Sequence, residues 1–242
     1  IAQEAGLPDG ALNIITGPVA VSEKLTSDPR VDLVSFTGSD LVGAAIMGQA
    51  APTLKRVMLE LGGKSAAIVM PDADLDAVMD SVRWGIFFNA GQVCSAMSRL
   101  IAHGDVHDEI VERAAAIAQS LSVGPGIERR EFGANMGAMV SDNQRDRAEA
   151  LCKRAAADDA TIVTGGHRLN QPGSFLAPTI ISGVRPEMEI ATTEVFGPVL
   201  SVMKVSNEED AITLANSTEY GLVGGIFTAD IDAAHRAARQ IR

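Results

Sequence analysis

Two side chains near the middle of the chain could together perform acyl chemistry. Glu60 lies among apolar residues and is followed by a pair of glycines. Cys94 lies three residues after Gly91, in a segment of small and polar residues. A thiolate can attack a carbonyl carbon, and a carboxylate can take a proton from the water that later releases the acyl group. These two residues are therefore the first candidates for catalysis.

Each candidate also has a structural interpretation. An isolated cysteine in a globular domain is more often a small core residue than a nucleophile. The helix-breaking residues before Cys94 and the serines after it favour instead an exposed loop, where backbone N–H groups can stabilise a thiolate. Strand alternation puts Glu60 on the side of Met58 and Gly62, which we expect to face partly inward, and a shielded carboxyl suits a general base. A strand-end glutamate pointing into water fits the pattern equally well.

Two further segments could contact a nucleotide. The run Phe36-Thr37-Gly38-Ser39 ends a predicted strand and opens a helix, where free N–H groups attract phosphate. It lacks the Lys-Ser or Lys-Thr pair of a triphosphate-binding loop, and a tight turn with a serine N-cap explains it as well. The acidic and aromatic residues of 194–198 could hold a ribose and pack on a flat ring, or could form a turn before the next strand.

The apolar periodicity predicts alternating strands and helices along the chain. The first part reads strand, helix, strand, helix, strand, which implies parallel βαβ units, and the pattern restarts after Gly62. We therefore expect two domains, residues 1–61 and 62–242. Predicted strands cover residues 12–15, 31–36, 53–61, 65–70, 99–103, 161–164, 178–181, 199–205 and 223–227. Predicted helices cover residues 1–5, 19–26, 40–50, 74–88, 106–120, 142–157, 207–216 and 231–240.

Charge and composition exclude several classes of function. The net charge of −11 and the absence of a basic stripe argue against nucleic-acid binding. No apolar run is long enough to span a bilayer. With two cysteines in 242 residues a disulfide framework is implausible, so a reducing compartment, the cytoplasm, is expected. We predict no metal site, because Gly104 should break any helix that pairs His103 with His107. Cys152 is expected to be packed, and Arg129 and Arg145 to be solvated.

Taken together, the motifs resemble those of the aldehyde dehydrogenase superfamily. The likeness runs through the whole chain, and five segments carry it in family order: N-I-I-T-G at 13–17, F-T-G-S at 36–39, L-E-L-G-G-K-S at 59–65, F-x-N-x-G-Q-x-C at 87–94 and E-V-F-G-P at 194–198. The resemblance implies part of a Rossmann-like parallel sheet, the C-terminal half of a dinucleotide-binding domain, followed by an α/β catalytic domain that bears the thiol.

The resemblance also implies a reaction. Cys94 would attack a small-molecule aldehyde, NAD or NADP would accept hydride, and Glu60 would activate the water that hydrolyses the thioester. By the same resemblance, the presence of Glu60 favours hydrolysis over transfer to coenzyme A. Trp84, Phe88, Val93 and Ser95 could line a substrate tunnel, although Trp84 and Phe88 could also be ordinary helix core. By the same resemblance the residues that contact the cofactor are Gly17, Gly38, Ser39, Val42, Leu61, Gly62, Glu194 and Phe196.

Alternatives remain at this stage. The protein could be a coenzyme A-acylating semialdehyde dehydrogenase or a non-catalytic binding or structural relative. Both chain ends fall inside helical patterns, as in a piece of a longer polypeptide, although frayed natural termini would look similar. The family's oxyanion-hole asparagine and adenosine-ribose lysine would then lie outside these residues. We expect a parent homodimer or homotetramer, and weak cofactor binding and poor turnover by the 242-residue chain alone.

Overall fold

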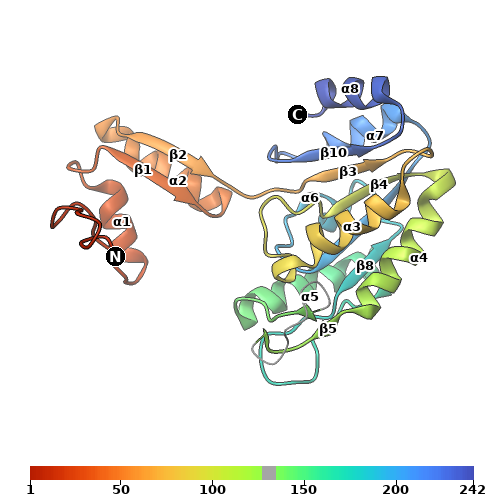
Figure 1. The fold of residues 1–242 in the computed structure, drawn as a ribbon, viewed down its shortest axis with the longest axis horizontal. Coiled ribbons are helices and arrows are strands. Elements are labelled where there is room, and N and C mark those ends of the chain that lie inside the picture. Colours follow the sequence, from red (N-terminus) through yellow and green to blue (C-terminus); the bar gives the residue numbers. More distant parts are fainter. Residues whose placement is uncertain (127–134) are drawn as a thin grey trace. The chain divides into compact units, whose positions relative to one another are not determined.

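Figure 1 shows the fold of the chain, a computed structural model that describes residues 1–126 and 135–242. The chain divides into two compact units, Ile1–Leu61 and Gly62–Arg242. Each unit has its own sheet, and each is described by itself below.

The first unit is a βαβ unit preceded by a helix. Its elements are α1 (Val19–Ser27), β1 (Leu33–Thr37), α2 (Asp40–Ala50), a 3-10 turn (Ala51–Thr53) and β2 (Arg56–Glu60). The two strands pair in parallel, from Leu33 opposite Arg56 to Thr37 opposite Glu60. Alternate residues of both strands are half-buried and the others exposed, so the sheet has one open face. Ile46 and Ala50 of α2 are the only apolar side chains buried in this fully described unit.

Two predicted elements of the first unit are absent. Residues 12–15 form no strand, and Ile14 is 84% exposed. A short apolar run becomes a strand only when it finds a partner, and β1 and β2 pair only with each other here. The predicted helix at 1–5 is a turn closed by the N–H of Ala5 on the carbonyl oxygen of Ile1.

The second unit is built on a six-stranded sheet in the order β10-β3-β4-β9-β8-β7. All neighbouring strands are parallel except β7, which runs antiparallel to β8. Its strands are β3 (Ala66–Val69), β4 (Arg99–His103), β7 (Thr161–Thr164), β8 (Thr179–Ser182), β9 (Val199–Val205) and β10 (Gly224–Phe227), and a separate pair is β5 (Ser122–Val123) with β6 (Asn135–Met136). Its helices are α3 (Leu75–Ile86), a 3-10 segment (Phe88–Gly91), α4 (Gly104–Ser120), α5 (Asp142–Ala157), α6 (Glu189–Thr192), α7 (Glu208–Ala215) and α8 (Ile231–Gln240).

Helices cover both faces of this sheet (Figure 1). Strand alternation divides the apolar side chains between two cores: Ala67, Val69 and Leu100 pack with α3, α4 and α5. Ile68 and Ile101 point the opposite way, into the core under α7 and α8. The central strands are therefore buried on both sides, as expected for a parallel sheet.

Hydrogen bonds from side chains fix several ends of these elements. Asp74 caps α3 by accepting from the N–H groups of Asp76 and Ala77. Contrary to expectation, α4 begins at Gly104, because His103 caps it by accepting from the N–H of Asp105. His107 is thus part of a regular helix.

Arg99, 1% exposed at the start of β4, ties three segments together. It donates to the carbonyl oxygens of Lys64 (2.8 Å), Leu214 (2.9 Å) and Ala215 (2.7 Å). The end of α7 is thereby joined to the chain that enters β3. These carbonyls would otherwise be costly to bury.

Two expectations about single residues have opposite outcomes. Cys152 is fully buried in α5 as predicted, and burial raises the pKa of its thiol to about 12. Arg145 is not solvated: its side chain is 12% exposed and pairs with Asp142 and Asp146 on its own helix. Arg129 lies outside the described residues.

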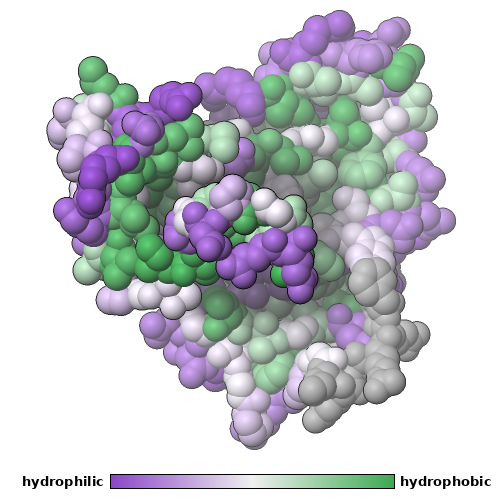
Figure 2. Space-filling model, turned by 60° about the vertical axis from the view of Figure 1, so that its left-hand side comes forward, coloured by the Kyte–Doolittle hydropathy of each residue, from purple (hydrophilic) through white to green (hydrophobic). Residues whose placement is uncertain are grey.

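Large apolar side chains remain open to solvent, and Figure 2 shows several green apolar areas on the face that it presents. In the first unit they include Ile14, Leu41, Leu54 and Met58. Exposed apolar residues scattered singly are normal, but so many in a unit with only two buried ones indicate a weakly stabilised piece of structure.

Candidate active site

Cys94 lies on a sharply kinked connection between α3 and β4. Asn89, Ala90 and Gly91 follow one another in the left-handed region, with φ of 51°, 53° and 70°. Only glycine fits at 91, because a Cβ there would lie 2.1 Å from the carbonyl oxygen of Gly197. The kink ends the helix and leaves the Cys94 side chain half-buried with a free thiol. Cys94 therefore lies in the predicted loop and not in the core, although it is half-buried where we expected an exposed position.

Amide side chains hold this connection in place. Asn89 and Gln92 each donate a side-chain N–H to the other's carbonyl oxygen, at 3.0 and 3.2 Å. The side-chain oxygen of Gln92 also accepts from the backbone N–H of Val140 at 2.8 Å. These bonds fix the backbone two residues before Cys94, which gives the sulfur a defined position.

The glycine pair brings Cys94 and Glu194 to one place in the second unit. The N–H of Gly63 donates to the carboxylate of Glu194 at 3.0 Å. A Cβ on Gly62 would lie 2.6 Å from the same carboxylate, and a Cβ on Gly63 would lie 2.5 Å from the carbonyl oxygen of Cys94. Both glycines are thus needed so that a carboxylate and the thiol-bearing backbone can approach one strip of main chain.

The segment that bears Glu194 is anchored by α5. The side-chain amide of Gln144 donates to the carbonyl oxygens of Val195 (2.9 Å) and Phe196 (3.0 Å). Arg147 donates to the carbonyl oxygen of Glu194 at 3.2 Å. Phe196 itself has a left-handed backbone with φ of 51°. Sequence reasoning missed Gln144 and Arg147, because a polar face of an amphipathic helix does not show which loop lies against it.

The site residues of the second unit gather where parallel strands begin. Gly63, Cys94 and Glu194 precede β3, β4 and β9, which are neighbours in the sheet. Open α/β sheets more often bind ligands at the carboxyl ends of their strands. Here Gly63, Cys94 and Glu194 lie on loops that lead into strands, so each strand fixes the C-terminal end of its loop.

In the first unit Gly38, Ser39 and Leu61 directly follow the carboxyl ends of β1 and β2. The N–H of Gly38 donates to the carbonyl oxygen of Glu60 at 3.0 Å, which places the two segments side by side. Ser39 caps α2 by accepting from the N–H of Val42 at 3.4 Å, as the serine-cap interpretation anticipates. Leu61 packs on Gly43, where a Cβ would lie 2.7 Å from the leucine side chain.

The expectation that Glu60 faces partly inward is wrong. Alternation does put Glu60 on the side of Met58, but both residues are exposed, because no described element of the first unit covers that face of the sheet. Gly17 and Val42 are also exposed. That Cys94 and Glu60 converge stays a prediction.

Trp84 and Phe88, two aromatic residues before Cys94, are not helix core. Trp84 is 42% exposed and Phe88 is 51% exposed, while Val93 is half-buried and Ser95 exposed. Exposed aromatic side chains beside a reactive loop are compatible with contact to a small organic molecule.

In the part of the chain that the structure describes, there is neither a cluster of metal-ligating side chains nor a helix that could span a membrane. Across residues 1–126 and 135–242, no group of three or more His, Cys, Asp or Glu side chains could hold a metal ion. Within those same ranges, no helix has the length and apolar character needed to cross a membrane.

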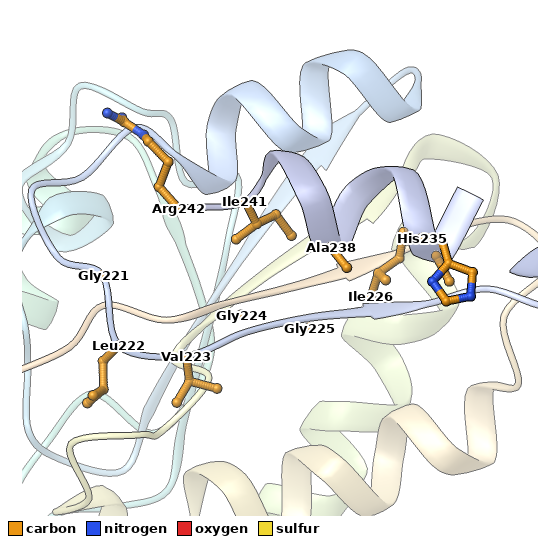
Figure 3. A pocket seen from close by; sticks show the side chains of 11 residues that line it. Gly221, Leu222, Val223, Gly224, Gly225, Ile226, His235, Ala238, Ile241 and Arg242 are labelled. Carbon is orange, nitrogen blue, oxygen red and sulfur yellow. The ribbon is translucent and has the colours of Figure 1, made fainter. Parts of the chain in front are cut away.

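A pocket of about 540 Å³ lies elsewhere in the second unit, against the edge strand β10 (Figure 3). Residues of β10 and α8 line it, among them Ile226, His235 and Ile241. Neither Cys94 nor Glu194 lines it, and its walls are chiefly glycine and aliphatic side chains. We therefore do not assign the chemistry to this pocket.

Comparison with known proteins decides the family. The sequence model of the aldehyde dehydrogenase family matches residues 1–242. The chain belongs to the aldehyde dehydrogenase family. The predicted family and the α/β fold are thereby confirmed.

Aldehyde dehydrogenases from distant organisms resemble this chain closely. A mitochondrial aldehyde dehydrogenase of Leishmania tarentolae is 43% identical over 96% of the chain and 47% of its own length. The peroxisomal aminoaldehyde dehydrogenase 1 of Pisum sativum is 42% identical over 100% of the chain and 48% of its own length. The chain therefore spans about half the length of the curated relatives it matches.

Solved aldehyde dehydrogenase structures have the same fold. The NAD-dependent enzyme of Sinorhizobium meliloti is 39% identical, with a TM-score of 0.94 over 100% of the chain and 48% of its own. The NAD+ complex of the Bacillus cereus enzyme is 35% identical, with a TM-score of 0.94 over 99% of the chain and 48% of its own.

Proposed function

We propose that the protein oxidises a small-molecule aldehyde to a carboxylic acid with NAD+ or NADP+. The observation that carries this proposal is the cluster of Cys94, Gly63 and Glu194, in which the backbone of the loop that bears a free, half-buried thiol packs on the same glycine whose N–H holds a carboxylate. Family membership supports the reaction class, and relatives named as NAD-dependent support the cofactor.

The residues present fit a dinucleotide. In the first unit α2 begins at Gly38-Ser39, and the first N–H groups of a helix attract a pyrophosphate. In the second unit the carboxylate of Glu194 can accept from ribose hydroxyls while Gly63 holds it. We propose the cofactor contacts that the resemblance implies: Gly17, Gly38, Ser39, Val42, Leu61, Gly62, Glu194 and Phe196. On this view residues 1–61 belong to the dinucleotide-binding domain and residues 62–242 form the catalytic domain.

The chain's own residues then have distinct tasks. The sulfur of Cys94 adds to the aldehyde carbon, and the carbonyl oxygen becomes an oxyanion. A bound nicotinamide supplies the acceptor for the hydride that this carbon must lose. Cys94 is left holding the acyl group as a thioester. Glu60 takes a proton from a water molecule, which attacks the thioester carbon, and the thiolate of Cys94 leaves as the acid forms.

Two variants of the full-length polypeptide that carries this chain test the assignment. We expect Cys94→Ser to lower NADH formation to background, because an alcohol without a base is a poor nucleophile. We expect Glu60→Gln to give a burst of about one NADH per site and then steady turnover slowed about 100-fold or more, since only hydrolysis needs the base. Stopped-flow absorbance separates burst from steady state.

Other outcomes have defined meanings. Glu23→Gln, an exposed glutamate of α1, serves as the matched control and should behave as the parent. Parent-like turnover by Glu60→Gln would remove Glu60 as the base, and parent-like turnover after alkylation of Cys94 would favour a non-catalytic thiol. Acyl-coenzyme A formed on addition of coenzyme A would favour the acylating alternative. An aldehyde panel with NAD+ and NADP+ identifies the substrate class.

We also propose a reducing compartment, the cytoplasm, and a homodimeric or homotetrameric parent. Both cysteines are free, and the proposed reaction needs a reduced thiol. Relatives carry the names mitochondrial and peroxisomal, so fractionation of cells that produce the tagged full-length protein is the direct check. Light scattering on the purified protein measures its oligomeric state.

A further inference from the structure

Gln92 belongs to the thiol loop (residues 87–98, between α3 and β4), and the proposed chemistry leaves it without a task. It is half-buried and lies two residues before Cys94. Both ends of its side-chain amide are bonded: Nε2 donates to the carbonyl oxygen of Asn89 at 3.2 Å, and Oε1 accepts from the backbone N–H of Val140 at 2.8 Å. The first bond stays inside the loop. The second reaches a segment 48 residues further along the chain and so attaches the loop to another element of the second unit.

Val140 lies at the start of α5. It directly precedes Ser141, whose hydroxyl caps this helix by accepting from the N–H of Gln144 at 3.2 Å. The side chain of Val140 is 79% exposed, so apolar packing does little to hold this residue. The bond to Gln92 thus joins the thiol loop to the N-terminal turn of α5 through main chain that the helix cap has already ordered.

The same turn of α5 holds the loop that carries Glu194. The side-chain amide of Gln144 donates to the carbonyl oxygens of Val195 and Phe196, at 2.9 and 3.0 Å. Three residues later, Arg147 donates to the carbonyl oxygen of Glu194 at 3.2 Å. The start of α5 is therefore bonded both to the thiol loop and to the loop of Glu194.

The two loops also meet directly, at a pair of glycines. A Cβ on Gly91 would lie 2.1 Å from the carbonyl oxygen of Gly197. A Cβ on Gly197 would lie 3.0 Å from the side chain of Met139 and 3.3 Å from that of Ala148. This packing keeps the loops from coming closer together but has no preferred direction, whereas a hydrogen bond weakens steeply when its angle changes. The bond at the start of α5 therefore adds an orientation that the glycine packing does not supply.

We propose that Gln92 is a positioning residue: by accepting the N–H of Val140 it ties the thiol loop to the N-terminal turn of α5, and so sets the sulfur of Cys94 relative to the loop of Glu194. This inference rests on the proposed function. There, hydride passes from the carbon held on Cys94 to a nicotinamide whose ribose Glu194 binds, so the relative position of the two loops decides how well the reacting atoms line up. This role does not require Gln92 to touch the aldehyde or the nucleotide.

Gln92→Met removes both polar ends of the side chain and keeps most of its length. With the full-length polypeptide in excess over aldehyde and with saturating nucleotide, we expect the single-turnover rate constant to fall about tenfold or more, because an ångström of misplacement can cost about 100-fold. The dissociation constant for the reduced nucleotide should match the parent's, since Glu194 keeps its own supports. The thermal unfolding midpoint should also match, because the N–H of an exposed residue such as Val140 can bond with water instead. A residue that only stabilised the fold would change all three quantities together.

Alkylation separates the position of the sulfur from its reactivity. Iodoacetamide is small and is not held by the protein, so it reaches a thiol from many directions. We expect Cys94 of Gln92→Met to be alkylated at about the parent's rate, although single turnover has slowed. Much faster alkylation would show a loop that has opened, and much slower alkylation would show a less reactive thiol. Either result overturns the positioning role.

Two further variants separate the bond to Val140 from an effect of charge. Gln92→Glu keeps an oxygen that can accept from the N–H of Val140, whereas Gln92→Lys has only donors. We therefore expect the single-turnover rate constant of Gln92→Glu to exceed that of Gln92→Lys by about tenfold. A charge effect alone gives the opposite order, because a carboxylate near the sulfur disfavours the thiolate and the oxyanion. Equal rates or the opposite order overturn the inference, also if Gln92→Met does not fold.

Failures of the two proposals are distinguishable. Gln171→Met, at an exposed glutamine between β7 and β8, is the matched control and should behave as the parent in every assay. A parent that forms no reduced nucleotide with any aldehyde of the panel, or that still forms it after Cys94→Ser, overturns the proposed function and the role of Gln92 with it. An active, Cys94-dependent parent whose Gln92→Met variant reacts at the parent's rate overturns the inference about Gln92 alone.

Discussion

The α-carbon of Gly63 bears no side chain, and the carbonyl oxygen of Cys94 uses the space. A Cβ built there would lie 2.5 Å from that oxygen, closer than real contacts allow. The neighbour is backbone, which cannot rotate away as the end of a side chain can. The absence of a side chain at Gly63 therefore allows the loop that bears Cys94 to pack closely against the chain that leads into β3.

We expect Gly63→Ala to move the Cys94 loop and to impair the reaction more than the fold. Overpacking of this kind costs about 1–3 kcal/mol of stability, and displacement of a nucleophile by an ångström can cost about 100-fold in kcat/KM. Gly85→Ala, in α3 with no atom within 4 Å of the added methyl, is the control and should be neutral or more stable by about 0.5–1 kcal/mol. Urea denaturation and steady-state kinetics measure both, and equal activities would contradict the steric argument.

At this scale the sequence predicts part of the site. The thiol loop follows from helix breakers and small residues around Cys94, and the Gly62-Gly63 pair indicates a close approach. The burial of Lys64, which is 1% exposed, could have been suspected, because it lies two residues before the apolar run Ala66–Val69. The exposure of Glu60 could not be inferred, since alternation shows which residues share a face and not whether anything covers it.

Helix α5 links the loop that carries Glu194 to the larger core of the second unit. Its buried side contributes Leu151 and Cys152 to the larger core, while Gln144 and Arg147 bind the backbone of the loop that carries Glu194. One helix thus fixes both the packing and the loop. A change in the core that shifts this helix should therefore reach the loop through the hydrogen bonds that the side chains of Gln144 and Arg147 donate to its carbonyl oxygens.

Removing the amide of Gln144 should loosen this loop. In Gln144→Ala the carbonyl oxygens of Val195 and Phe196 lose their donor, and an unmet carbonyl costs about 1–3 kcal/mol. We expect that loss in urea denaturation, together with weaker nucleotide binding, because Glu194 lies on the same segment. Asn143→Ala, which removes an exposed amide from the same helix, is the control and should change neither quantity. Unaltered stability of Gln144→Ala would show that the loop is held by other contacts.

Among the elements, long periodic helices were the most predictable. Residues 40–50, 142–157 and 231–240 form helices with the predicted bounds, because their apolar spacing and caps agree. The strands at 99–103, 161–164 and 199–205 also have the predicted bounds. The shortest elements, α6 and the two-residue strands β5 and β6, were not predicted, because they depend on tertiary contacts. The run at 12–15 shows the converse, since hydrophobicity without a partner makes no strand.

The two units of the whole molecule differ in how much they bury. The second unit has a six-stranded sheet with a core on each face, whereas the first has two strands and two buried apolar side chains. Free energies of local opening follow buried apolar contact. The sheets of the two units should therefore open locally with different free energies.

Hydrogen–deuterium exchange on the 242-residue chain tests this difference. We expect amides of β1 and β2 to exchange about 100-fold or more faster than those of β4 and β9, which are buried on both faces. Mass spectrometry of peptides from the two units gives the comparison within one sample. Matching protection of both sheets would mean that the first unit gains support that its own burial does not supply.

The sealed position of Cys152 has a practical consequence for studying this chain. Packed in α5 and kept from ionising by its surroundings, that sulfur is chemically silent toward alkylating or disulfide reagents at neutral pH. A thiol reagent added to the native protein accordingly labels Cys94 alone, and the number of labelled thiols per chain rises from one to two when the chain unfolds. The molecule thus contains its own internal standard, a second thiol that distinguishes a labelled site from a denatured sample.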